Sequence, residues 1–184
     1  AFGGRALDDF GPKYLNSSES LLYKKNKNLY FTQDFISSIK KKGYVFLVEG
    51  YFDVLALNKL GYSNVASPSG TALTTHQLEV LARYTKKILL CFDNDVAGLN
   101  ATERVLELRN QLESKIETHC LNLPDKYKDL SELFENNPES FKDVLKDNSE
   151  LVEFLLDKSL SITNDKKHVF EYFQKLSKYL SPLE

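Results

Sequence analysis

The chain has 184 residues, of which 42% are hydrophobic and 27% are charged, so it can bury a core and hold one domain with smaller attached pieces. No apolar run approaches the roughly 18 residues of a membrane span, and no basic leader with an apolar stretch opens the sequence. We therefore expect a cytoplasmic protein without a membrane partner. The net charge of −2 argues against a wholesale nucleic-acid-binding protein, which would be basic throughout.

The first 42 residues form a basic segment in an otherwise acidic chain. Lysine and arginine outnumber the carboxylates here, and Tyr14, Tyr23 and Tyr30 lie between them. Cations follow phosphates and aromatic faces stack on bases, so this composition is typical of a nucleic-acid-binding segment. A solvated lysine-rich surface is the alternative interpretation.

Apolar runs of strand length alternate with helical stretches between Gly43 and Leu123. Thr74 and Gln77 form a possible capping box, and Gly61 stands where a helix should stop. The alternation indicates βαβ units, and the unbroken apolar runs suit strands buried on both sides. We therefore predict an α/β fold with a mostly parallel sheet and helices on both faces. Strands are predicted at 44–48, 64–67, 88–92 and 116–123, and helices at 52–60, 75–84 and 98–112.

The chain after Pro124 reads as helices without strands. Helices are expected around Phe141, at 151–160 and at 169–180. The last has an apolar side at helical spacing that we predict to be core, formed by Val169, Phe170, Phe173, Leu176 and Leu180.

Two other features of composition carry expectations. Cys91 and Cys120 lie in apolar runs and form no CxxC pair, which predicts buried free thiols and no zinc site or disulfide framework. The chain opens on Ala1 and contains no Met, from which we expect a fragment of a longer protein.

Carboxylates follow two of the predicted strands directly. Glu49 follows the first strand, and Asp93 and Asp95 follow the strand at 88–92. Residues two apart in extended backbone point to one side, and ligands of open parallel sheets bind beyond the carboxyl ends of the strands. Mg²⁺ prefers such oxygen ligands, and Asp53 and Asp129 could lie on the same rim. For the pair Asp93 and Asp95, the alternative is a solvated turn after a strand. For Asp53, the alternative is a charge that stabilises the N-terminus of a helix.

Three stretches resemble the successive motifs of a Toprim domain, in the version found in DnaG-type bacterial primases. They are Val48-Glu49-Gly50-Tyr51-Phe52-Asp53-Val54, Pro68-Ser69-Gly70-Thr71-Ala72-Leu73-Thr74 and Phe92-Asp93-Asn94-Asp95-Val96-Ala97-Gly98. Upstream, Gly3-Gly4-Arg5-Ala6-Leu7 and Pro12-Lys13-Tyr14-Leu15-Asn16-Ser17 resemble the basic segment that precedes Toprim in those primases. The resemblance covers about residues 1 to 130, and the helical tail carries no matching motif.

The resemblance implies a site for Mg²⁺, with Mn²⁺ as a substitute. The implied metal ligands are Glu49, Asp53, Asp93, Asp95 and Asp129, with Glu49, Asp93 and Asp95 as the catalytic carboxylates. The family often has Asp-Pro-Asp where this chain reads Asp129-Leu130-Ser131, so an acid is missing at position 131. Gly70 and Thr71 are implied to form the loop flanking the metals.

The resemblance also implies template-directed synthesis of short RNA primers on single-stranded DNA from ribonucleoside triphosphates. Arg5, Lys13, Asn16 and Lys25 would bind the template or the nucleotide. For the full-length protein it implies a replicative helicase as partner, through a domain outside this chain. The implied domains are a basic segment (1–42), a Toprim domain (43–130) and a helical subdomain (131–184). A Toprim domain of a topoisomerase or nuclease and a non-catalytic nucleic-acid-binding module are the two alternatives.

Overall fold

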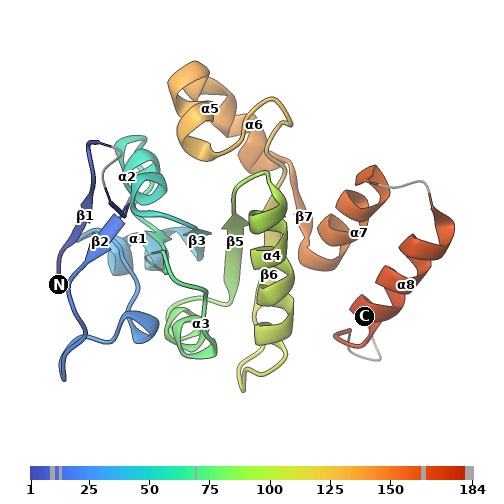
Figure 1. Cartoon of the computed structure of the whole chain (residues 1–184), viewed down its shortest axis with the longest axis horizontal. Coiled ribbons are helices and arrows are strands. Elements are labelled where there is room, and N and C mark those ends of the chain that lie inside the picture. Colours follow the sequence, from blue (N-terminus) through green and yellow to red (C-terminus); the bar gives the residue numbers. More distant parts are fainter. Residues whose placement is uncertain (9–10, 13, 69, 163–164, 181–184) are drawn as a thin grey trace.

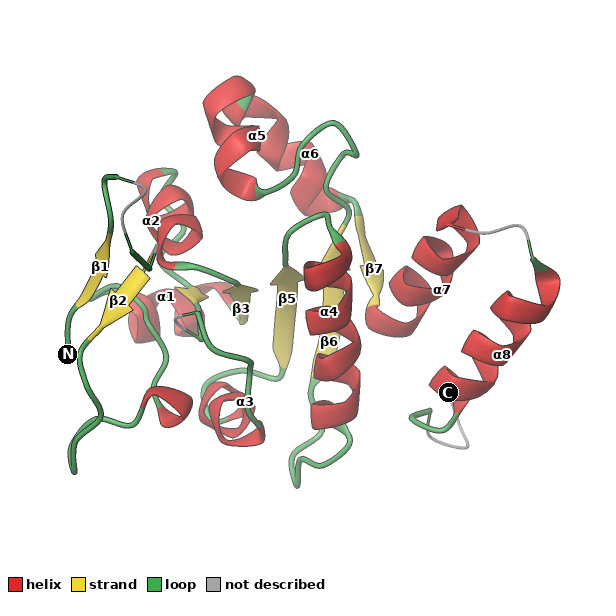
Figure 2. Ribbon diagram, viewed as in Figure 1, coloured by secondary structure: helices red, strands yellow, loops and turns green. Residues whose placement is uncertain are grey.

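A five-stranded sheet flanked by helices organises the chain (Figure 1, Figure 2). The computed structural model describes residues 1–8, 11–12, 14–68, 70–162 and 165–180. Among these residues, none of the helices combines the length and apolarity that a membrane crossing requires. The strands of the large sheet are β3 (Tyr44–Val48), β4 (Val65–Ala66), β5 (Lys87–Cys91), β6 (Glu117–Leu121) and β7 (Asn148–Glu150). The α-helices are α1 (Phe35–Lys42), α2 (Tyr51–Lys59), α3 (Thr75–Ala82), α4 (Val96–Arg109), α5 (Leu130–Asn136), α6 (Phe141–Lys146), α7 (Leu151–Ile162) and α8 (Lys166–Ser177).

The order of the strands creates a switch point in the middle of the sheet. The order is β4-β3-β5-β6-β7, and the first four of these strands pair in parallel. The chain leaves β3 for β4 through α2 and returns through α3 to β5, on the other side of β3. Open α/β sheets bind ligands at such a reversal, beyond the carboxyl ends of the strands. The ends of β3 and β5 are therefore the expected ligand edge.

Side chains of the central strands alternate between two cores. Val45 and Leu47 of β3 belong to a core with α1, α3, α4 and α7, whereas Phe46 and Val48 belong to a core with α2, α5 and α6. Because successive strand residues face opposite sides, a strand covered on both faces is apolar throughout. The predicted mostly parallel sheet with helices on both faces is thus confirmed. The predicted burial of both cysteines is confirmed as well, and both are free thiols.

The sheet gains an edge strand that the sequence did not predict. The polar segment Asn148–Glu150 forms β7 and pairs antiparallel with β6. Its residues have no apolar alternation, so the pairing is decided by the backbone groups of the β6 edge, which need partners. The prediction of helices without strands after Pro124 is wrong at this point.

Helix α8 is less buried than its apolar pattern predicts. Phe170 is 60% exposed and Phe173 is 45% exposed, whereas Leu176 is fully packed. The helix also docks through polar contacts, since the Tyr172 hydroxyl donates to Glu103 of α4 at 2.6 Å. The assignment of Phe170 and Phe173 to the core is therefore wrong. Only part of the apolar side of α8 packs against the rest of the protein.

The first 42 residues contain short elements and one helix. Strands β1 (Gly3–Arg5) and β2 (Tyr14–Asn16) form an antiparallel hairpin. Tyr30 exchanges two backbone hydrogen bonds with Ser67, of 2.8 and 3.0 Å, which joins the segment to the body beyond β4. A short 3-10 turn of this segment lies at Lys25–Lys27 (η1). A second one, outside the segment, lies at Pro138–Ser140 (η2). The domain limits at 42 and 130 remain predictions.

Candidate functional site

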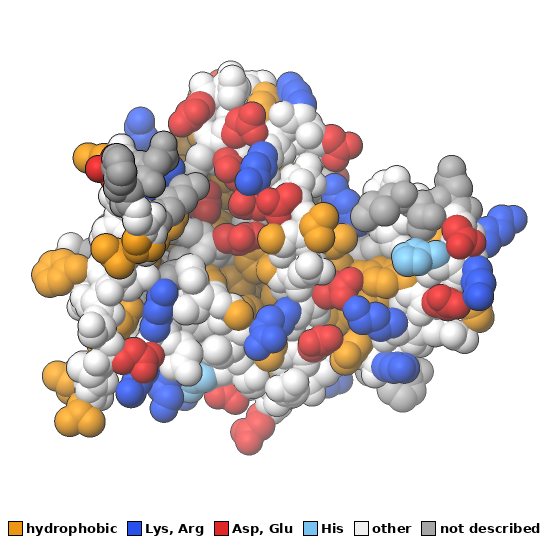
Figure 3. Space-filling view, in the orientation of Figure 1, with side chains coloured by type: hydrophobic (Ala, Val, Ile, Leu, Met, Phe, Trp, Pro, Cys, Tyr) orange, Lys and Arg blue, Asp and Glu red, His pale blue; other side chains and the backbone are white. Residues whose placement is uncertain are grey.

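Acidic side chains gather at the ends of β3 and β5, near the centre of the face shown in Figure 3. Glu49 follows β3, and Asp93 follows β5 after Phe92. The Glu49 Oε1 atom accepts a hydrogen bond from the backbone N–H of Asp93 at 3.0 Å. This bond links two strand ends that lie 44 positions apart in the chain. The sequence placed these two acids just beyond strand ends at one edge of the sheet, and the hydrogen bond shows that they lie together there.

Asp53 occupies the helix-start position that the sequence offered for it, and its role as a metal ligand remains a prediction. It lies in the first turn of α2, where its Oδ2 atom accepts the backbone N–H of Gly50 at 3.0 Å. Burial, and after it the negative charges of Asp93 and Asp129, raise the pKa of Asp53 to about 6. The side chain therefore serves the helix start and interacts electrostatically with the other acids.

The acids at the strand ends disfavour one another's ionisation. Burial, and then the charges of Glu49 and Asp129, raise the pKa of Asp93 to about 6. The pKa of Glu49 is also raised, first by burial, although the Asp93 N–H opposes the shift. Like charges that are partly removed from water need a proton or a cation to relieve them. The cluster is thus suited to attract a cation.

Asp95 has a different environment from Asp93. It caps α4, and its Oδ1 atom accepts the Gly98 N–H at 3.0 Å, which is the largest cause of its lowered pKa. Its Oδ2 atom lies 3.6 Å from the ammonium of Lys128. Asp95 therefore stays ionised and forms an ion pair with Lys128. We predicted α4 to begin at Gly98, but this cap starts it at Val96.

The loop before α5 and the first turn of this helix bring three further groups to the edge. Asp129 caps α5 by accepting the Glu132 N–H at 2.8 Å. The Ser131 hydroxyl, at the position where an acid is missing, donates to Asp53 Oδ1 at 3.4 Å. The Lys128 carbonyl accepts the backbone N–H of Asn94 at 2.6 Å. Lys128 was not singled out from the sequence, because nothing local signals its contact with a residue 33 positions earlier.

Gly98 ends the third motif, and the sequence alone did not indicate its role. A Cβ at this position would lie 2.0 Å from the carbonyl oxygen of Asp93. Only glycine permits this approach of the α4 start to the β5 end. The positions of Asp93 and Asp95 therefore depend on the absence of a side chain at position 98.

The donor chemistry of the edge suits a hard divalent cation. Carboxylate oxygens are the preferred ligands of Mg²⁺, which usually keeps waters or takes phosphate oxygens as well. As the described residues stand, no group of three or more acidic, histidine or cysteine side chains is arranged to hold an ion. The residues fit a metal by type and electrostatics, and oxygens from water or a ligand would have to complete its coordination.

Two residues of the basic segment lie against the start of α2. The Arg5 guanidinium lies 5.0 Å from the ring centre of Phe52 and 5.7 Å from that of Tyr14. Asn16 Oδ1 accepts a hydrogen bond from the Tyr51 hydroxyl. Tyr51 and Phe52 precede Asp53 in the chain, so the hairpin is brought to the helix that carries one of the acids. Lys13 lies outside the described residues.

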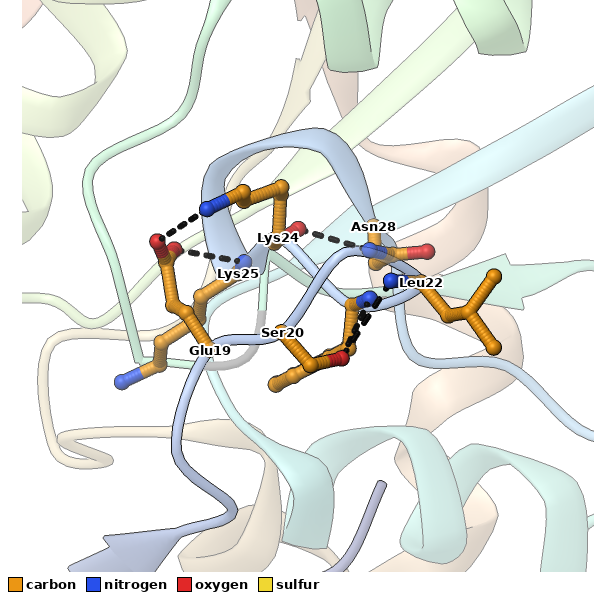
Figure 4. A network of polar contacts seen from close by, with 7 residues as sticks. Glu19, Ser20, Leu22, Lys24, Lys25 and Asn28 are labelled. Atoms are coloured by element: carbon orange, nitrogen blue, oxygen red, sulfur yellow. Dashed lines mark hydrogen bonds and ion pairs between the residues drawn. The ribbon is translucent and has the colours of Figure 1, made fainter.

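Lys25 lies in a compact turn that is held by its neighbours (Figure 4). Glu19 accepts the Lys25 backbone N–H at 3.1 Å and the Lys24 ammonium at 3.4 Å. The Asn28 amide donates to the Lys24 carbonyl at 2.6 Å. In the part of the chain that the structure describes, the Lys25 ammonium has no carboxylate partner, which leaves its charge available to an anion.

Gly70 and Thr71 lie in the loop between β4 and α3. Gly70 has a φ of +70°, which glycine adopts readily, and the Thr71 hydroxyl donates to the Pro68 carbonyl at 2.7 Å. Within the described ranges, neither residue forms a hydrogen bond with the carboxylates. Their role beside a metal remains a prediction.

Comparison with protein families divides the chain into two matched stretches. Residues 46–134 match a family described as Toprim-like. Residues 1–35 match a family described as the N-terminal domain of the DNA primase catalytic core. The two matches cover the acidic edge and most of the basic segment, respectively.

Individual relatives agree with these families. A DNA primase of Aquifex aeolicus is 35% identical over 173 residues, covering 94% of this chain and 34% of the relative. The crystal structure of the zinc-binding and RNA polymerase domains of Aquifex aeolicus primase is similar with a TM-score of 0.79 and 32% identity, covering 98% of this chain and 44% of that one. A DnaG primase catalytic domain bound to single-stranded DNA has a TM-score of 0.71 and 27% identity, covering 88% and 51%. The chain thus spans about a third of the length of the curated relative.

Proposed function

Because the chain belongs to the family of DnaG-type DNA primases, we propose that it supplies the metal-binding part of a catalytic core that makes short RNA primers on single-stranded DNA. The reaction is template-directed nucleotidyl transfer from ribonucleoside triphosphates. In it, the 3′-hydroxyl of the growing primer attacks the α-phosphorus of the incoming nucleotide, and pyrophosphate leaves.

The hydrogen bond between Glu49 and the Asp93 backbone is the observation that carries this proposal. It joins the ends of β3 and β5 at the switch point, where burial and the charges of neighbouring acids raise the pKa values of both carboxyl groups. Such an arrangement costs stability unless a cation or proton relieves it, so its presence favours a functional site.

Each acid has a part in the proposed site. Asp93 and Asp95 are the first choice as ligands of Mg²⁺, with Mn²⁺ as a substitute, and Asp53 and Asp129 support the same edge. Glu49 uses Oε1 for the Asp93 N–H, which leaves Oε2 either to bind the metal or to move a proton. When bound, divalent ions lower the pKa of an attacking hydroxyl and neutralise phosphate charge.

The basic segment is proposed to hold the template or the incoming nucleotide. Arg5, Lys13, Asn16 and Lys25 are the residues assigned to this task. Contacts of lysine and arginine with phosphate position a strand without reading its sequence, and they weaken as salt increases. Gly70 and Thr71 are proposed to flank the metals.

The proposed partners follow from the reaction. They are the single-stranded template and ribonucleoside triphosphates. For the full-length protein we also propose a replicative helicase, bound through a domain outside this chain. We also propose the division into a basic segment (1–42), a Toprim domain (43–130) and a helical subdomain (131–184). A topoisomerase or nuclease is disfavoured because residues 1–35 match the primase core family.

Incorporation of labelled ribonucleotides on an unprimed single-stranded DNA template tests the activity. We expect only weak synthesis of short RNA with Mg²⁺ or Mn²⁺ from the chain alone, and none from Asp93→Ala. Because the chain spans a third of its relative, the same pair is compared in the full-length protein too. Equal product from the Asp93→Ala variant would contradict the assigned site, and a full-length protein that makes no RNA would contradict the function.

A further inference from the structure

We propose that Lys158, on α7, is a positioning residue that holds the acidic loop through Asn94. The acidic loop is residues 93–95, and the inference rests on the proposed metal site at Asp93 and Asp95. Helix α7 lies in the tail of the chain, where the sequence offered no motif. The Lys158 ammonium donates a hydrogen bond to Asn94 Oδ1 at 3.1 Å, across 64 positions of sequence.

Asn94 is the middle residue of the acidic loop and is held on two sides. Its backbone N–H donates to the Lys128 carbonyl at 2.6 Å, and its side chain accepts from Lys158. Asn94 therefore connects the acidic loop to the loop before α5 and to α7. A movement of Asn94 would carry both neighbouring aspartates with it.

A pocket of about 280 Å³ borders the acidic loop, whose residues Asp93, Asn94 and Asp95 form part of its lining. Its walls come from α4, α7 and the ends of β5 and β6, and most of its lining is apolar, including Phe92, Leu99, Leu123 and Phe154. A loop that borders a pocket lacks the close packing that fixes side chains elsewhere in a protein. The position of the loop then depends more on its polar contacts, and the bond from Lys158 to Asn94 is one of them.

Lys158 joins two loops of the ligand edge. Its ammonium lies 3.6 Å from Asp125 Oδ1, in the loop after β6, while it also bonds Asn94 in the loop after β5. The Lys158 side chain is 27% exposed, in contrast to 94% for Asp125. An ion pair with so exposed a partner contributes little by itself. The more sheltered bond to Asn94 is thus the contact that should matter for the loop.

The sign of the effect on metal affinity separates positioning from simple electrostatics. Lys158 is a cation near the acids, so replacing it with a neutral residue makes the local potential more negative and should strengthen cation binding. If Lys158 positions the loop, its loss should weaken binding instead. Outer contacts that orient metal ligands typically contribute about 10-fold or more to affinity.

Mn²⁺ alone is the probe, titrated into the chain and measured by electron paramagnetic resonance of the free ion. We expect Lys158→Met, which keeps the hydrocarbon stem, to weaken binding about 10-fold. Lys158→Arg should recover most of the affinity because it can still donate to Asn94. The matched control is Lys146→Met, which removes an equal charge from a lysine that is 79% exposed and pairs only with Asp143 among the described residues.

Asn94→Ala tests the same contact without changing charge. It should weaken Mn²⁺ binding to a similar extent, and the double variant with Lys158→Met should be little worse than either single variant. Thermal unfolding of each variant, followed by circular dichroism, identifies any that fail to fold.

The outcomes separate this inference from the function on which it rests. Unchanged or tighter Mn²⁺ binding by folded Lys158→Met, with binding lost in Asp93→Ala, would overturn the positioning role alone. Equal loss in Lys146→Met would overturn it too, because any surface cation would then have the same effect. Wild-type protein that binds no Mn²⁺, or Asp93→Ala that binds normally, would overturn the proposed metal site and with it this inference.

Discussion

The acidic edge of the sheet and the basic amino-terminal segment are both proposed binding surfaces, but they are built differently. At the acidic edge, Glu49 and Asp93 are connected through a backbone N–H at the ends of buried strands. In the basic segment, β1 and β2 have three residues each, and Arg5 is exposed to solvent.

This difference has a physical consequence. Carboxylates held together by the fold repel one another, so their arrangement opposes stability until a cation or proton arrives. Exposed cations remain hydrated, cost the fold little and act on a ligand by attraction that salt screens. The acidic edge should therefore respond to metal and pH, and the basic segment to salt.

Gly98→Ala should have the largest effect and would show how far the acidic edge depends on the backbone. The new Cβ would lie 2.0 Å from the Asp93 carbonyl oxygen, so the α4 start or the β5 end must move. We expect a loss of about 3 kcal/mol in the free energy of unfolding, measured by chemical denaturation. Mn²⁺ binding should fall with it. Gly4→Ala, in the hairpin, is the matched control because its Cβ would meet only an atom at 4.0 Å; similar losses for both variants would refute the contrast.

Removing one charged group from each region tests whether the two surfaces bind different ligands. Asp93→Asn keeps the shape of the side chain and should lower Mn²⁺ affinity by about 100-fold, since a ligand of the ion is lost. Arg5→Ala should not weaken Mn²⁺ binding at all. Isothermal titration calorimetry on both variants gives the comparison, and weaker metal binding by Arg5→Ala would mean that the two regions act as one site.

Stability without metal should fall as pH rises from about 4 to about 7. The pKa values of Asp53 and Asp93 are raised to about 6 in the folded protein, so the folded state binds more protons than the unfolded state in this window. At pH 6 each group is half ionised in the folded state, so the fall continues through this pH and the curve flattens at about 7. Asp95, with its lowered pKa, acts in the opposite sense below this window.

Asp53→Asn removes one of these carboxyl groups, so the stability of the variant should decrease less as pH rises. Melting temperatures measured between pH 4 and pH 7 in the presence of a chelator provide the test. The variant should gain relative stability at pH 7 and little at pH 4. A wild-type melting temperature that rises through this window would contradict the raised pKa values.

The salt dependence of DNA binding should distinguish the basic segment from the acidic edge. Of the effects predicted here, this one should be the smallest. Lys25→Ala removes a lysine that has no carboxylate partner among the described residues, so about one phosphate contact should be lost. The slope of log affinity for single-stranded DNA against log salt should then become shallower by about 0.7. Fluorescence anisotropy at several salt concentrations measures it, with Lys59→Ala on α2 as a control. An unchanged slope would remove Lys25 from the proposed template path.

Local sequence patterns determined the main architecture of this protein. Continuous apolar runs such as Tyr44–Val48 predicted strands buried on both faces, because a strand between two helical layers has no polar side. Carboxylates placed directly after those runs predicted an acidic edge, because parallel strands end together. The Thr74 and Gln77 capping box was likewise readable, since both partners lie within one helical turn.

Only the tertiary structure decided the features that depend on distant partners. The polar strand β7 exists because β6 offers an unpaired edge, and Phe173 is exposed because α8 packs through only part of its apolar side. Contacts of Lys128 with Asp95 and of Lys158 with Asn94 join residues far apart in the chain. Their physical cause is the packing of loops and helices around the ends of the sheet, which brings together side chains that no local pattern relates.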